Sequence, residues 1–296
     1  MLDRRSFLKG AVALPLVLPL QSSQERISPI GLQLFTVRSE IEKDFEGTLA
    51  RVAAIGYKEV EFAGYFGRSP QEVRAVLQRT GLTGVSAHYN FSSLGNQWSG
   101  IVDAARIAGH QYLVIVSIDG ASRVQPDIWQ RASEQFNRAG EACKVAGLKF
   151  AYHNHLFEFA SSPGTAKLPY EILLELTDPS LVSMQMDLCW IIAAGQDPAD
   201  YFRRYPGRFS SVHVKDLKRV PPSSAHLGEV PSRDAVLPDL AEVGQGIIDW
   251  PGVLARCWAA GIRHYFVEHE DPAISFASID RSFRYLDLLR FSAATR

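Results

Sequence analysis

Residues Lys144–His155 read KVAGLKFAYHNH, and this short stretch decides how the rest of the chain is interpreted. Its first part has helical character and ends at Gly147, because glycine adopts the left-handed conformation after a helix at little cost. An apolar run follows at once, as expected for a strand that is buried on both faces. The run ends in histidines, which can bind metals or move protons. The stretch therefore predicts a helix, a buried strand and a functional strand end in succession.

The same unit recurs along the chain. Helical stretches also end at Gly56, Gly81, Gly109 and Gly261, and an apolar run follows each of them. The starts of helices are marked as well, because a capping residue stands one or two positions before a proline. Such capping residues are Ser69, Asp197 and Asp249.

Eight apolar runs are strand candidates, with helical segments between them and after the last. This alternation indicates right-handed parallel units. Eight units over about 270 residues match a (β/α)8 barrel, which takes ~250 residues. We therefore predict a single TIM barrel over residues 26–296. The predicted strands are 30–37, 58–62, 83–88, 112–117, 149–155, 181–187, 209–215 and 263–269.

A doubly wound open sheet is the alternative fold. It is disfavoured because no G-x-G-x-x-G fingerprint follows the first predicted strand. The longest irregular stretch, about 217–246, follows the seventh strand. In a barrel this stretch lies on the catalytic face, where long loops usually serve function.

The first 25 residues have the features of an export signal. Arg4 and Arg5 precede the apolar stretch Gly10–Leu20, which is too short to span a bilayer of ~30 Å as a helix. Pro15 and Pro19 disfavour the alternative of an amphipathic helix. The paired arginines resemble a twin-arginine signal, so we expect residues 1–25 to direct the chain to the periplasm. No membrane span is expected beyond an uncleaved signal.

The overall charge limits the partners. The formal net charge is -1, without the basic excess of a nucleic-acid-binding protein. We therefore expect a small-molecule partner and no nucleic acid. Assembly into an oligomer is left open.

Polar residues interrupt the apolar runs at the ends of the later strands. The fifth strand ends in His153 and His155, and the sixth ends in Asp187. The seventh carries His213 and Lys215 on one face, as the eighth carries Glu268 and Glu270. Carboxylates that converge in a narrow barrel mouth repel one another unless a cation offsets them. A divalent metal is the simplest cation to do so.

These motifs resemble the xylose-isomerase-like TIM-barrel family, the sugar phosphate isomerases/epimerases. The resemblance lies in His-Asn-His-x-x-Glu, Met-Asp-x-x-Trp, Val-His-Val-Lys-Asp and Val-Glu-His-Glu at the ends of strands five to eight. It implies one divalent metal, Mn, Mg, Co or Zn, held by Glu158, Asp187, His213 and Glu268. Glu158 would have to reach in from beyond its strand. Glu270 shares a face with Glu268 and is an alternative ligand.

The resemblance also implies a mechanism. The metal would polarise a sugar carbonyl and stabilise an enediolate, with Glu158 and Glu268 as the acid/base pair. His155 and Lys215 are rival bases, and Lys215 is alternatively a donor to the developing oxyanion. The expected substrate-binding residues are His88, His153, Trp190, Phe35 and Glu270.

Export points to an unphosphorylated sugar, because sugar phosphates are mainly cytosolic. The first expectation is thus an isomerase or epimerase that abstracts an α-proton. A keto-glycoside lyase or dehydratase could use the same enolisation, and a carbohydrate-binding barrel without catalysis is an alternative of another class. A phosphate-ester nuclease would need more metal ligands and a basic face, and a hydride-transferring enzyme would need the missing glycine fingerprint.

Overall fold

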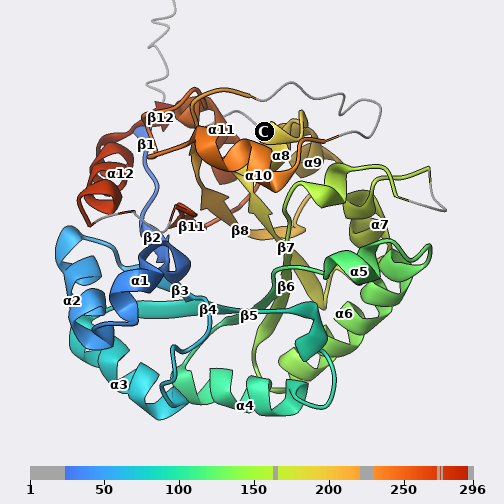
Figure 1. Ribbon diagram of the computed structural model, residues 1–296, viewed down its shortest axis with the longest axis horizontal. Helices are drawn as coiled ribbons and strands as arrows, with labels where there is room; N and C mark the ends of the chain where they lie inside the picture. Colours follow the sequence, from blue (N-terminus) through green and yellow to red (C-terminus); the bar gives the residue numbers. More distant parts are fainter. Residues whose placement is uncertain (1–23, 163–165, 221–229, 272–273, 275, 293–296) are drawn as a thin grey trace, which may run out of the picture.

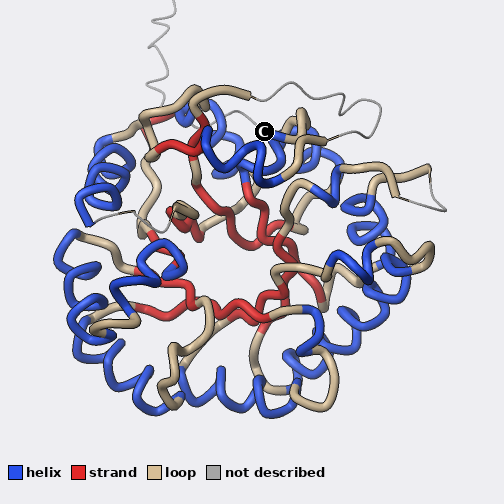
Figure 2. Tube along the Cα trace, in the orientation of Figure 1, coloured by secondary structure: helices blue, strands red, loops and turns tan. Residues whose placement is uncertain are grey.

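The computed structural model describes residues 24–162, 166–220, 230–271, 274 and 276–292. Its centre is a closed barrel of eight parallel strands, in which β2 pairs with β3 on one side and with β11 on the other. This closure confirms the predicted (β/α)8 barrel and excludes an open sheet. Figures 1 and 2 show the strands as an inner ring surrounded by helices. The barrel strands are β2 (Gly31–Gln33), β3 (Glu59–Phe62), β4 (Thr83–Tyr89), β5 (Tyr112–Ile115), β6 (Lys149–His153), β7 (Val182–Asp187), β8 (Phe209–Val214) and β11 (His264–Val267).

The helices begin and end at the expected signals. All five glycines that were predicted to end helices have a positive φ. Ser69, Asp197 and Asp249 each accept a hydrogen bond from a backbone N–H in the first turn of their helix. The described α-helices are α1 (Arg38–Ile41), α2 (Phe45–Ile55), α3 (Pro70–Thr80), α4 (Trp98–Ala108), α5 (Gly120–Arg123), α6 (Ile128–Val145), α7 (Pro169–Leu176), α8 (Leu188–Ala193), α9 (Pro198–Arg204), α10 (Arg233–Val236), α11 (Trp250–Ala259) and α12 (Phe276–Leu288).

The first barrel strand is shorter than predicted. It ends at Gln33, and Leu34–Val37 form a 3₁₀ helix instead of continuing the strand. The reason is local, because the Gln33 side chain accepts a hydrogen bond from the N–H of Phe35 and so caps this turn. The turn leaves Phe35 in the wall of a pocket at this end of the barrel.

The interior of the barrel is divided into layers. One buried apolar cluster consists of strand residues alone, namely Val85, Tyr112, Val114, Ala151 and Phe266. A polar layer lies next to it, nearer the carboxyl ends of the strands, and its side chains are buried as well. Buried polar groups are costly unless they are paired, so this layer must supply its own hydrogen bonds.

Between β8 and β11 the chain leaves the barrel in a long segment, called the excursion here, and both ends of this segment are bonded to the side chain of Asp216. The short strands β9 (Asp216–Leu217) and β10 (Leu240–Ala241) pair antiparallel at its base. Buried Asp216 accepts hydrogen bonds from the N–H groups of Gly244 and Gly246 and from the indole N–H of Trp250. Within the described part of the predicted irregular stretch, Val230–Arg233 line the pocket at the carboxyl ends of the strands.

The two ends of the described chain meet at the outside of the barrel. β1 (Gln24–Glu25) pairs with β12 (Phe291–Ser292). The predicted signal falls almost wholly on residues 1–23, outside the described residues. Among the described helices, none has the length and apolar character needed to cross a membrane.

A substitution at Gly246 tests how much the close packing against Asp216 and Leu217 contributes to stability. A Cβ atom at this position would lie 2.1 Å from Asp216 Oδ1 and 2.3 Å from the carbonyl oxygen of Leu217. Gly246→Ala should therefore destabilise the protein by about 1–3 kcal/mol, the cost of overpacking. Thermal unfolding should show a Tm lowered by several degrees. Gly100→Ala in α4 is the control, since a Cβ atom there meets open space. Equal Tm values for the two variants would contradict the prediction.

Candidate functional site

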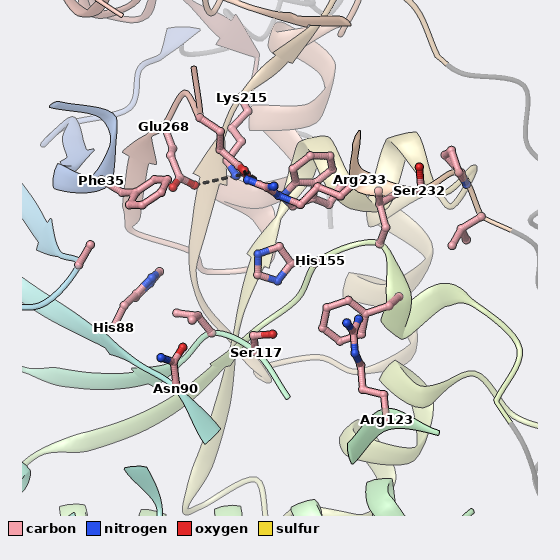
Figure 3. A pocket seen from close by; sticks show the side chains of 18 of the residues that line it. Phe35, His88, Asn90, Ser117, Arg123, His155, Lys215, Ser232, Arg233 and Glu268 are labelled. Carbon is pink, nitrogen blue, oxygen red and sulfur yellow. Dashed lines mark hydrogen bonds and ion pairs between the residues drawn. The ribbon is translucent and has the colours of Figure 1, made fainter. Parts of the chain in front are cut away.

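A pocket of about 840 Å³ lies at the carboxyl ends of the barrel strands. Figure 3 shows His155 near its middle, with Lys215 and Glu268 on one side and Asn90 and Ser117 on the other. Barrel enzymes build their active sites at this end of the fold. The remaining lining residues are Phe35, Ala63, His88, Tyr89, Val116, Arg123, Leu156, Phe157, Trp190, Val230, Pro231, Ser232, Arg233 and Glu270.

Lys215 holds three carboxylates together at one side of the pocket. Its Nζ lies 2.8 Å from Asp187 Oδ2, 2.7 Å from Glu268 Oε2 and 2.8 Å from Glu270 Oε1. Burial alone would lower the pKa of the ammonium, but the three carboxylates outweigh it and raise the pKa well above its ordinary value. A charged ammonium has three donors and no lone pair, so in this arrangement Lys215 acts as the cation that offsets the three carboxylates.

His213 connects this group to the barrel interior. Its Nδ1 lies 2.7 Å from Glu268 Oε2 and its Nε2 lies 2.6 Å from Glu61 Oε1. Burial opposes the charged imidazolium, but Glu268 and Glu61 raise the pKa of His213 to about 10. Burial would likewise raise the pKa of Glu268, but Lys215 and His213 lower it below its ordinary value.

Two overlapping groups of side chains could hold a metal ion. One consists of Asp187, His213 and Glu268, and the other of His88, His153 and His213. Asp187 Oδ2 is fully buried and accepts no hydrogen bond of sound geometry from any described residue, although Lys215 Nζ lies close to it. His153 Nε2 and His213 Nδ1 each lie 3.8 Å from this oxygen. Carboxylate oxygens and imidazole nitrogens at these separations suit a divalent cation.

The expectation that Glu158 reaches into this group is not met by the geometry. Neighbouring residues of a strand point to opposite faces, so Tyr152 faces α6, 5.0 Å from the ring of Phe136, while His153 faces the interior. Glu158 stays with Tyr152, because its Oε1 accepts from the Tyr152 hydroxyl at 2.5 Å and its Oε2 accepts from the N–H of His155 at 2.8 Å. Within the described chain, neither metal-capable group nor the pocket wall includes Glu158.

Where Glu158 was expected, His153 lies beside Asp187, with its Nε2 3.8 Å from Asp187 Oδ2. Four consecutive barrel strands then supply His153, Asp187, His213 and Glu268. Between the two glutamates of the last strand, Glu268 belongs to a metal-capable group. Glu270 instead joins Lys215 to Arg233, whose Nε lies 3.0 Å from Glu270 Oε2. Glu270 thus lines the pocket beside the group.

His155 and Trp190 both line the pocket, and each carries a buried polar atom that has no partner among the described residues. His155 Nδ1 and Trp190 Nε1 are buried and unbonded in the part of the chain that the structure describes. Burial lowers the pKa of His155 to about 3, so its ring is uncharged near neutral pH. Phe35 and His88, also expected to bind substrate, line the same pocket, whereas His153 lies deeper, behind His88.

Glu61 and Arg233 were not among the residues predicted from the sequence. Glu61, on β3, is fully buried and is bonded to His213, Gln185 and Gln33. A signal for it was present, because a buried parallel strand that reads Glu-Val-Glu-Phe departs from the continuous apolar pattern. Arg233 was missed because it lies in the irregular stretch, where no periodicity indicates which side chains point inward.

A closed parallel barrel with carboxylates, imidazoles and a lysine at its carboxyl end defines a candidate metal-dependent site on a TIM barrel. The family model described as "Xylose isomerase-like TIM barrel" matches residues 49–291. The chain therefore belongs to the xylose isomerase-like TIM barrel family, as the motifs suggested.

The chain is also similar to curated proteins and to solved structures. The chain is 23% identical to an inosose dehydratase of Geobacillus kaustophilus over 262 residues, which is 77% of this chain and 80% of the relative. It is 24% identical to an inosose dehydratase of Lacticaseibacillus casei over 272 residues, 83% of this chain and 90% of the relative. Among solved structures, a sugar phosphate isomerase/epimerase from Parabacteroides distasonis matches with a TM-score of 0.71 and 24% identity, covering 94% of this chain and 99% of the other. The likeness between the solved structure and this chain shows a shared fold.

Glu158 should make stability depend on pH. Burial raises the pKa of its carboxyl from 4.5 to about 7, so between these values the folded state binds more protons than the unfolded state. The free energy of unfolding should therefore fall by on the order of 3 kcal/mol as the pH rises through this window. In Glu158→Gln this contribution should be absent, which denaturant titrations from pH 4 to pH 8 would measure. Parallel pH profiles for the variant and the parent would contradict the assignment.

Proposed function

We propose that this chain is a metal-dependent enzyme that removes a proton next to the carbonyl of an unphosphorylated sugar or sugar-like ring. The comparisons support the broader class, a sugar-acting enzyme that is an isomerase/epimerase or a lyase. One observation carries the proposal, the convergence of Asp187, His213 and Glu268 at the base of the pocket.

Elimination is the favoured outcome. The two curated relatives described above are named inosose dehydratase, and dehydration begins with the same proton removal as isomerisation or epimerisation. After this proton leaves, loss of a β-oxygen gives a lyase product, whereas return of a proton gives an isomer or epimer. The first expectation from the sequence, an isomerase/epimerase, thus differs from the favoured outcome only after the shared step.

The residues that would hold the metal are His153, Asp187, His213 and Glu268. A bound divalent ion supplies Lewis acidity, which polarises a carbonyl oxygen. Two imidazoles and two carboxylates suit Mn, Co or Zn better than Mg, which prefers oxygen ligands. The cation would lie beside Lys215, which already offsets the negative charge of Asp187 and Glu268.

The contacts of the two rival bases support His155 over Lys215 as the proton acceptor. The three donors of the Lys215 ammonium face carboxylates, so its role is to hold those side chains in place. His155 has an unbonded Nδ1 among the described residues, and its ring is stacked 5.8 Å from Phe157 at an angle of 12°. We assign the proton transfer to His155 and a hydrogen bond to a substrate oxygen to the Trp190 indole N–H.

The size of the pocket favours a keto-glycoside as a second candidate substrate. Ligand pockets span ~300–1,000 Å³, and about 840 Å³ lies in the upper part of that range. Such a pocket has room for a second ring beyond the reacting sugar. In a keto-glycoside that second group would leave as the β-oxygen is expelled, so the same residues would act as a glycoside lyase.

Export is part of the proposal. Arg4 and Arg5 before an apolar stretch support a twin-arginine signal and a periplasmic enzyme. Fusion of residues 1–25 to a folded reporter should carry it to the periplasm. Arg4→Lys combined with Arg5→Lys should keep the reporter in the cytoplasm, and equal export of the two fusions would contradict this part of the proposal.

Proton exchange tests the chemistry. In heavy water with a panel of inososes, keto-sugars and keto-glycosides, the protein should exchange the α-proton of at least one substrate. Asp187→Asn should abolish exchange through loss of the metal. His155→Gln should slow exchange by ~10²–10⁴-fold while the metal is retained, because it removes the proton acceptor.

Two variants serve as controls for this experiment. Asp103→Asn changes an exposed aspartate on α4, and His264→Gln changes a histidine that is bonded to Glu59 at the other end of the barrel. Both should exchange at the parent rate. Exchange that persists in metal-depleted Asp187→Asn would overturn the mechanism, and no exchange with any substrate would favour a carbohydrate-binding barrel without catalysis.

Metal content tests the same site without a substrate. Protein purified without chelators should hold about one equivalent of a divalent ion by elemental analysis. Asp187→Asn should hold much less, because it converts the buried, unbonded Oδ2 into part of a weakly coordinating amide. Less than about half an equivalent in the parent protein would count against the enzyme and for the binding barrel.

A further inference from the structure

We infer that Glu61 is a positioning residue, which orients the hydrogen bonds of the barrel interior so that His153 presents a nitrogen lone pair toward Asp187 and His213 presents there the nitrogen that can give up its hydrogen to a cation. This inference rests on the proposed metal-dependent function. It assigns a task to Glu61 and Gln185, two buried residues that were not predicted to be functional.

Glu61 is the acceptor at the centre of this layer. Its side chain is fully buried, and an ionised carboxylate can only accept hydrogen bonds. Oε1 lies 2.8 Å from Gln33 Nε2, 2.6 Å from His213 Nε2 and 2.8 Å from His88 Nε2. Oε2 accepts from Gln185 Nε2 at 2.6 Å and from the Ser86 hydroxyl. Each of these neighbours must therefore direct a hydrogen toward Glu61.

Gln33 fixes the direction of the first branch. Its Oε1 accepts from the backbone N–H of Phe35 at 3.0 Å, so its Nε2 must be the end that faces Glu61. The same Nε2 lies 3.2 Å from His88 Nδ1, which must then accept. An uncharged His88 therefore carries its hydrogen on Nε2, where it faces Glu61 and the side-chain oxygen of Gln185 at 2.8 Å.

The orientation of the Gln185 amide determines which nitrogen of His153 carries the hydrogen. Because Gln185 Nε2 donates to Glu61, its Oε1 is left as an acceptor. This oxygen lies 3.0 Å from His153 Nδ1, so His153 must carry a hydrogen on Nδ1. The other nitrogen, Nε2, then has a free lone pair, and it is the nitrogen that lies 3.8 Å from Asp187 Oδ2.

His213 is oriented by a direct hydrogen bond to Glu61. Its Nε2 donates to Glu61, so Nδ1 is the nitrogen that can give up its hydrogen to a cation. Nδ1 lies 3.8 Å from Asp187 Oδ2, as His153 Nε2 does. One buried carboxylate thus directs two imidazoles toward one oxygen. Carboxylates and other polar groups that bond the second nitrogen of a metal-binding histidine typically change metal affinity by ~10–100-fold.

A glutamine at position 61 should disturb this arrangement. Its amide nitrogen would face a donor, either Gln185 Nε2 or the imidazole of His213. If Gln185 turns to relieve the clash, its amide nitrogen faces His153 Nδ1, and the hydrogen of His153 moves to Nε2. That nitrogen then has no lone pair to offer near Asp187.

Metal affinity distinguishes this role from a merely structural one. Glu61→Gln should weaken the binding of Zn²⁺ and Mn²⁺ by ~10–100-fold in competition with a chelator. Glu59→Gln is the matched control, because Glu59 lies two residues away on β3, is also buried, and is bonded to His264 at 2.9 Å, away from the pocket. It should lower the Tm but leave metal affinity unchanged. An unchanged affinity in Glu61→Gln, or equal losses in both variants, would overturn the inference.

A second measurement needs no variant at position 61. The parent protein with ¹⁵N-labelled histidine, stripped of metal, should show His153 with its hydrogen on Nδ1 and His88 with its hydrogen on Nε2 in long-range ¹H–¹⁵N spectra. Assignment uses His153→Gln and His88→Gln. A hydrogen on His153 Nε2 would overturn the inference even if Glu61→Gln does not fold. If the parent binds neither ion, the proposed function fails, while the spectra still decide the role of Glu61.

Discussion

The rest of the site depends on one constraint, that carboxylates buried in the mouth of a barrel must be matched by positive charge and by hydrogen-bond donors. Lys215 meets this need for Asp187, Glu268 and Glu270, and Arg233 adds a second cation at Glu270. One level deeper, His213 and a set of amide and hydroxyl donors do the same for Glu61. His213 is bonded to Glu268 in the first level and to Glu61 in the second, so the two levels are fixed together.

The fold was predictable because its signals are local. Glycines with positive φ at helix ends and capping residues at helix starts depend on a few neighbouring residues. The carboxyl ends of parallel strands meet at one end of a barrel, so Asp187, His213 and Glu268 were predicted together and do lie together. The same reasoning applied to Lys215 and Glu270, which lie beside them.

The parts that could not be predicted depend on which way a side chain points. His153 rather than Glu158 faces the interior, because the alternation along β6 directs Tyr152 outward and the following turn leaves Glu158 against it. Glu61 and Gln185 lie within strands that were judged by their apolar character, and their importance comes from contacts between strands far apart in sequence. Such contacts are set by the closure and register of the barrel, which a single sequence does not reveal.

Asp216 has a consequence for how this enzyme could change its specificity. The excursion that carries Val230–Arg233 into the pocket wall leaves and rejoins the barrel at this one carboxylate, and the N–H of Lys218 is bonded to the carbonyl oxygen of Asp239 across its base. The cost of lengthening a loop whose ends are already held together grows only slowly with its length. The chain between Lys218 and Asp239 can therefore vary in length and sequence at a small entropic cost, and so change one wall of the pocket, as long as a cation still faces Glu270 in place of Arg233.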